Sequence, residues 1–77
     1  MLPHMPSLPV ISGAEAVRAL QRLGFIVVRQ RGSHIVLRKG SQACVVPNHR
    51  EIKTGTLAGL LKQGSVSIDD FISALSS

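Results

Sequence analysis

Hydrophobic positions recur at helical spacing soon after the start of the chain. Four apolar residues fall on one face of a predicted helix over residues 13–23: Ala16, Val17, Leu20 and Leu23. Ser12 and Glu15 form an S-x-x-E capping box at its start, and Gly24 stands where a glycine ends a helix. Three prolines precede this helix and predict an extended, mobile lead-in over residues 1–11.

Three runs rich in β-branched residues follow, separated by glycines. They predict strands over residues 25–29, 34–39 and 42–47, with turns at residues 31–33 and 40–41. Because these connections are short, the strands should form an antiparallel meander.

The middle strand alternates between apolar and polar residues. Ile35 and Leu37 should face the helices, which leaves His34 and Arg38 on the open face of the sheet or at its rim. The first strand is apolar on both faces, so a sheet covered on one side only would expose part of it. Exposed apolar surface of this kind often marks a partner site.

Two further helices are predicted after a polar loop over residues 47–56. One begins near Thr54 or Gly55 and ends at Gly64, and the other is short and opens with an S-x-x-D signature at Ser67. The element order is then α-β-β-β-α with a short extra helix at the C-terminus. This order predicts an α+β domain of two layers, with helices on one face of a three-stranded antiparallel sheet.

The net charge of +5 lies in the middle of the sequence. Residues 29–53 hold six cations and one anion, namely Arg29, Arg31, Arg38, Lys39, Arg50 and Lys53 against Glu51. The charges in the rest of the chain balance. A local basic surplus favours phosphate backbones, although a solvated basic surface would have the same composition.

Other features of the composition narrow the functional classes. Cys44 is the single cysteine, which excludes an intrachain disulfide and a cysteine-based zinc site and suggests a small core residue. The apolar runs are too short to cross a membrane and the N-terminus makes a poor signal peptide, so a cytoplasmic protein is expected. Because the histidines and acids lack ligand spacing and nucleotide-binding glycine motifs are missing, no metal and no cofactor are expected.

The remaining candidate for chemistry is His34, in the stretch RQRGSHIVLRK. A histidine at the start of a strand is commonly structural, but three nearby arginines could hold a phosphodiester: Arg29, Arg31 and Arg38. Gly32 and Ser33 add backbone N–H groups that can approach a phosphate closely. RNA suits such a site because its 2′-hydroxyl is an internal nucleophile, so the enzyme needs only proton transfer and positive charge.

Other residues of the basic segment extend this candidate site. Lys39 and Lys53 complete the set of cations expected to contact phosphate. His49 is either a loop histidine hydrogen-bonded to the backbone or a second proton carrier or phosphate contact. Two alternatives to an endoribonuclease stay open, a non-catalytic RNA-binding module that uses the same basic face and a chain that mainly supports a protein complex.

Two stretches, LGFIVVRQRGSHIVLRKG and VVPNHREIKTGTLAGLLKQ, resemble the HicA toxin family, also called YcfA-like. The resemblance covers about residues 12–75 and rests on the joint occurrence of R-Q-x-G-S-H, V-P-x-H and G-T-L motifs. It implies a toxin domain over residues 12–77 that is similar to double-stranded-RNA-binding domains. It further implies a type II toxin that cleaves mRNA independently of the ribosome, with His34 as the catalytic residue. Its expected partner is a cognate HicB-like antitoxin that blocks the active site.

Overall fold

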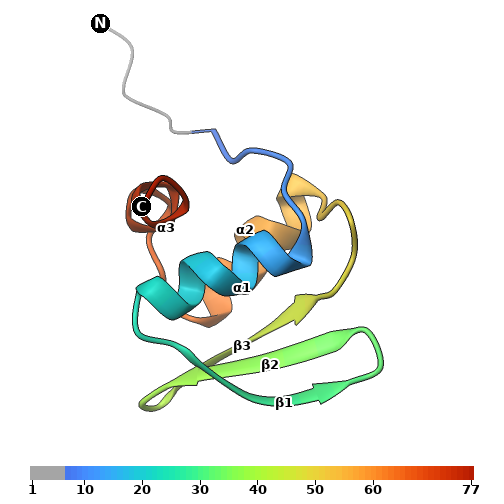
Figure 1. The fold of residues 1–77 in the computed structure, drawn as a ribbon. Helices are drawn as coiled ribbons and strands as arrows, with labels where there is room; N and C mark the ends of the chain where they lie inside the picture. The colour runs from blue at the N-terminus through green and yellow to red at the C-terminus, as the bar shows by residue number, and fades with distance from the viewer. Residues whose placement is uncertain (1–6) are drawn as a thin grey trace, which may run out of the picture.

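The computed structural model describes residues 7–77 as three helices and a three-stranded sheet arranged in two layers (Figure 1). The helices are α1, Gly13–Arg22; α2, Thr54–Gln63; and α3, Ile68–Leu75. The strands are β1, Ile26–Arg31; β2, His34–Lys39; and β3, Gln42–Pro47, in the sheet order β1-β2-β3. The helices lie on one side of this antiparallel sheet, and no other element of residues 7–77 covers its other side, the open face (Figure 1). The predicted α+β architecture is therefore confirmed.

The ends of α1 follow the capping signals in the sequence. The Ser12 hydroxyl accepts a hydrogen bond from the Glu15 backbone N–H at 3.1 Å, and the Glu15 carboxylate accepts one from the Ser12 backbone N–H at 3.1 Å. These two bonds satisfy N–H groups that have no partner within the helix. After the C-cap residue Leu23, Gly24 adopts a φ of 100°, which ends the helix one residue earlier than predicted.

The β1 strand ends two residues later than the predicted range of 25–29. The prediction was wrong because pairing with β2 continues as far as Arg31, which lies opposite His34. Cross-strand pairing outweighs the weak local preference of these polar residues for a strand. The turn to β2 is shortened to two residues, of which Gly32 takes the left-handed φ of 57°.

A β-bulge interrupts the regular alternation of β1. Val27 pairs with Leu37 and Arg29 pairs with Val36, so Val28 is the extra residue on β1. Successive side chains of a strand point to opposite faces, and one extra residue shifts all that follow to the other face. The bulge thus places Arg29 on the open face, where unbroken alternation would have turned it toward the helices.

The core lies between the sheet and the helices, and it is aliphatic except for two phenylalanines and one cysteine. Its buried residues are Ile11, Ala16, Ala19, Leu20, Phe25, Ile35, Leu37, Cys44, Val46, Ile52, Leu57, Leu60, Leu61, Phe71 and Ala74. The predicted inward side of β2, Ile35 and Leu37, is therefore confirmed, as is the core position of Cys44. Burial also raises the pKa of the Cys44 thiol, which keeps it protonated at neutral pH.

The lead-in predicted over residues 1–11 lies partly outside the described residues, which begin at Ser7. Its last residue, Ile11, is buried and pairs with Ile52 in an isolated β-bridge. The Ile52 backbone N–H donates to the Ile11 carbonyl at 2.7 Å. This pairing joins the segment before α1 to the loop before α2.

The predicted start and end of α2 and the predicted start of α3 are also confirmed. α2 begins at Thr54 and has Gly64 as its C-cap, and the Ser67 hydroxyl caps α3. The left-handed residue after α2 is Ser65, with a φ of 56°. Gly64 is closely packed, because an added Cβ would lie 3.3 Å from the Phe25 ring.

Candidate functional site

His34 is the first residue of β2 and its side chain is exposed. In the sheet it lies between Arg31 of β1 and Pro47 of β3, its paired residues on the two sides. The Ser33 carbonyl accepts a hydrogen bond from the Asn48 backbone N–H at 2.6 Å, which joins the β1–β2 turn to the segment after β3. The backbone around His34 is therefore held on both sides, while the imidazole reaches solvent.

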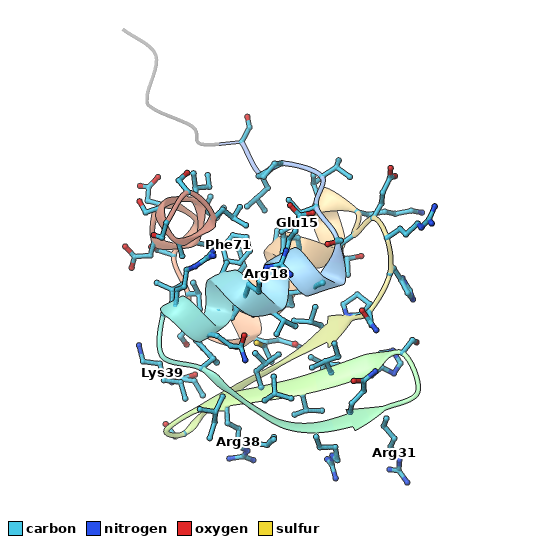
Figure 2. The ribbon with its side chains drawn as sticks, viewed as in Figure 1. Glu15, Arg18, Arg31, Arg38, Lys39 and Phe71 are labelled. Atoms are coloured by element: carbon cyan, nitrogen blue, oxygen red, sulfur yellow. The ribbon has the colours of Figure 1, made fainter. Side chains whose placement is uncertain are left out.

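Arginine side chains lie beside His34 on the open face. Directly opposite residues of an antiparallel pair have Cβ atoms about 4.5–5.5 Å apart, which puts Arg31 next to His34. Arg29 lies two residues before Arg31 on β1. The bulge at Val28 puts both arginines on the open face, which His34 shares. Figure 2 shows Arg31 extending away from the helices on the open side of the sheet. A phosphate at the His34 ring would therefore lie within reach of a guanidinium.

The two predicted cations at the end of β2 lie away from His34. Arg38 shares its face but is four residues further along the strand, or about 13 Å at the usual rise per residue. Lys39 donates a hydrogen bond from Nζ to the Leu23 carbonyl at 2.7 Å, at the C-terminal end of α1. A cation there interacts favourably with the helix dipole, which gives Lys39 a structural contact distant from His34.

A groove of about 390 Å³ borders His34, where α2 packs beside β3. Its lining residues are His34, Val45, Pro47, Thr56, Gly59, Leu60 and Gln63. None of the α2 residues in this lining was predicted from the sequence, because the groove depends on contact between α2 and β3. One local signal was available, namely a glycine in the middle of a helix, which is unfavourable unless it has a use.

His49 and Lys53 line a second depression, of about 280 Å³. This depression shares Pro47 and Thr56 with the groove beside His34, so the two hollows adjoin. His34, His49 and Lys53 therefore fall on one continuous surface. The His49 backbone is hydrogen-bonded, since its carbonyl accepts from the Gly13 N–H at 2.8 Å, and its side chain is exposed.

Gly13 allows the start of α1 to lie against the loop that carries His49. An added Cβ at Gly13 would overlap the Pro47 carbonyl oxygen and would lie 2.8 Å from the Asn48 Cα. The buried glycine thus permits a backbone approach that any side chain would prevent. The first turn of α1 in this way holds residues 47–49 in place, and Pro47 of this segment lines both hollows.

Two further properties bear on the kind of site. Within residues 7–77, no helix is long and apolar enough to cross a lipid bilayer. In the same part of the chain, His, Cys, Asp and Glu side chains do not gather in groups of three or more that could hold a metal ion. The polar groups beside the groove include the exposed His34 imidazole and the Arg31 guanidinium.

Comparison with known protein families matches residues 13–65 to the HicA toxin of bacterial toxin–antitoxin systems. The matched segment contains α1, the whole sheet and α2, and so it includes His34, His49 and the groove that borders His34. A search of curated proteins found no match. Because the matched segment covers more than half of the 77 residues, the chain belongs to the HicA toxin family of bacterial toxin–antitoxin systems.

Proposed function

We propose that this toxin is a metal-independent endoribonuclease that cleaves mRNA, with His34 as its catalytic residue. The observation that carries the proposal is the pairing of the exposed His34 with Arg31 at the edge of a groove. A proton carrier, a positive charge and a hollow for substrate then occur together at one end of the sheet.

The reaction uses the 2′-hydroxyl of the RNA as the nucleophile. It attacks the adjacent phosphorus, the bond from phosphorus to the 5′ oxygen breaks, and the fragments end in a 2′,3′-cyclic phosphate and a 5′-hydroxyl. Neutral His34 accepts the proton of the 2′-hydroxyl, or protonated His34 donates a proton to the leaving 5′ oxygen. Arg29 and Arg31 stabilise the negative charge that develops on the phosphoryl oxygens.

Other residues extend the contact with the RNA backbone. Gly32 and Ser33 form the turn next to His34 and offer backbone N–H groups to a phosphate. Lys53 lines the adjoining depression with His49, which is a second proton carrier or a phosphate contact. Arg38 contacts phosphates further along the strand, and the Lys39 ammonium group adds positive charge there while it keeps its hydrogen bond to the Leu23 carbonyl.

A HicB-like antitoxin is the proposed partner within the toxin–antitoxin system, and the cytoplasm, where mRNA is translated, is the proposed location. The open face of the sheet suits a partner because it exposes large apolar side chains among arginines. Ile26 is 63% exposed, Val28 46% and Val45 40%. A partner with apolar and acidic side chains would cover this surface and the His34 ring together.

The proposal is tested by incubating purified toxin with a long single-stranded RNA in the presence of EDTA. We expect discrete fragments with 2′,3′-cyclic phosphate ends from the wild type. We expect neither fragments nor growth inhibition from His34→Ala, whose exposed position leaves the fold intact. Full cleavage by folded His34→Ala, or cleavage that stops with EDTA, would contradict the proposal.

A second candidate function is a non-catalytic RNA-binding module, favoured by the same cations on the open face. The same incubation separates the two functions, because RNA binding without fragments supports the module. If Ile26→Asp on β1 abolishes partner binding and RNA is neither bound nor cleaved by the wild type, the chain supports a protein complex instead.

A further inference from the structure

We propose that the groove between β3 and α2 holds one unpaired base of the RNA next to the scissile phosphate, and that Gly59 keeps the groove open. This inference rests on the proposed function and adds to it a specificity site. The proposed catalytic residue His34 forms one wall of the groove. A base bound there therefore belongs to a nucleotide that adjoins the reacting linkage.

Gly59 is an unfavourable residue for its position in α2. It lies in the middle of a helix of 10 residues and is exposed. Glycine is the least favourable residue in a helix interior apart from proline. Among residues 7–77, no atom outside the helix backbone lies within 4 Å of the position that its Cβ would occupy. Packing within the folded chain therefore does not explain the glycine.

The shape and chemistry of the groove indicate what approaches Gly59 from outside. Val45 and Pro47 provide an apolar wall from β3, and Thr56 and Gln63 provide polar side chains from α2. The volume of about 390 Å³ lies in the range of small-ligand sites, which suits a single base rather than a duplex.

An unpaired base matches each part of this lining. Proteins recognise single-stranded RNA by packing bases against flat or apolar groups and by hydrogen bonds to the base edges. The Gln63 amide can donate and accept, and the Thr56 hydroxyl can do the same, so both can read a base edge. Thr56, Gly59 and Gln63 are spaced three and four residues apart, which places them on one flank of α2.

Gly55 supplies a matched control on the same helix. It too has open space where a Cβ would stand, but it lines neither the groove nor the depression beside His49. Gly59→Ala should raise the melting temperature by about 4–8 °C, because alanine is the better former of a helix interior, and Gly55→Ala in the first turn should raise it by less. Only a methyl group at Gly59 would narrow the groove.

The experiment compares Gly59→Ala and Gly55→Ala with the wild type in melting temperature and in kcat/KM for RNA cleavage. We expect Gly59→Ala to melt no lower than the wild type and to lose about tenfold or more in kcat/KM, the scale of one lost base contact. Gly55→Ala should cleave like the wild type, and Gln63→Ala should change the distribution of cleavage sites. Wild-type kcat/KM in Gly59→Ala would overturn the inference while leaving the endoribonuclease proposal intact.

A binding experiment keeps the inference separate from the cleavage reaction. A short 2′-O-methyl oligoribonucleotide has no free 2′-hydroxyl and cannot be cleaved by the proposed route. Its titration into isotope-labelled wild type should shift the amide signals of Thr56, Gly59 and Gln63, even if the protein proves not to cleave RNA. Unmoved signals at these residues during saturable binding would overturn the inference. Loss of antitoxin binding by Gly59→Ala with full RNA cleavage would also overturn it and assign the groove to a protein partner.

Discussion

His34 differs from the other cationic and titratable residues of the basic segment in what surrounds it. It is exposed, paired with Arg31 and next to a groove, whereas Lys39 donates its hydrogen bond to the end of α1. The R-Q-x-G-S-H motif allowed His34 to be predicted as a site residue. The contact of Lys39 with Leu23 could not be predicted, because it joins residues that are distant in the sequence and depends on where β2 ends beside α1.

Arg31 and Arg38 should differ in their importance for cleavage. Arg31 is the cross-strand partner of His34. Its loss should remove a charge-assisted contact with the phosphate of the RNA, worth about 1.5–3 kcal/mol, or roughly 10–100-fold in rate. Arg38 shares the face but lies at the far end of β2, so Arg38→Ala should have a small effect. The measurement is kcat/KM of both variants on one RNA, and an equal or larger loss in Arg38→Ala would contradict this assignment.

Glu15 should make the stability of the fold depend on pH. The hydrogen bond from the Ser12 backbone N–H holds the pKa of Glu15 below its usual value of 4.5, and the hydrogen bond with the Ser12 hydroxyl lowers this pKa further. A lowered pKa in the folded state means that the ionised carboxylate stabilises the fold above pH 4.5, and that this contribution is lost as pH falls through the lowered pKa.

Denaturant unfolding of wild type and Glu15→Ala at neutral and strongly acidic pH tests this dependence. The wild type should be the more stable of the two at neutral pH, and the difference should shrink in acid. Glu15→Gln is the control, because an amide can retain the capping geometry without titrating. A difference between wild type and Glu15→Ala that is the same at both pH values would contradict the prediction.

At the scale of elements, local signals located the helices and strands to within two residues. Caps at Ser12 and Ser67 and the hairpin glycines determine those boundaries through short-range hydrogen bonds and backbone conformation. The bulge at Val28 was not predictable, because it arises from the register between two strands. Its consequence reaches the candidate site, since it puts Arg29 on the face that His34 occupies.

Gly13→Ala should destabilise the protein even though alanine favours helices. The added methyl group overlaps the Pro47 carbonyl oxygen, and overpacking of this kind typically costs about 1–3 kcal/mol, more than the gain in helix propensity. Displacement of the segment that carries His49 should also reduce cleavage. Urea unfolding measures the change, with Gly55→Ala as the control, and equal stabilisation by both substitutions would contradict the packing argument.

At the scale of the whole molecule, the two layers of residues 7–77 leave one face of the sheet uncovered (Figure 1). Arg31, His34 and the groove lie together at one end of the sheet. The hydrophobic pattern predicted these layers, because each helix and strand has one apolar side that must be buried. The groove was not predicted, since its walls come from β3 and α2 and meet only after folding. Only the assembled fold therefore relates His34 to Gly59 and His49.

The central claim is that the imidazole of His34 transfers a proton during RNA cleavage, and chemical rescue tests it most directly. His34→Ala leaves a space at the edge of the groove into which free imidazole can diffuse. We predict that the variant is inactive alone, and that added imidazole restores cleavage in proportion to its concentration, with the same 2′,3′-cyclic phosphate ends. Cleavage by His34→Ala at the wild-type rate without imidazole would contradict the account.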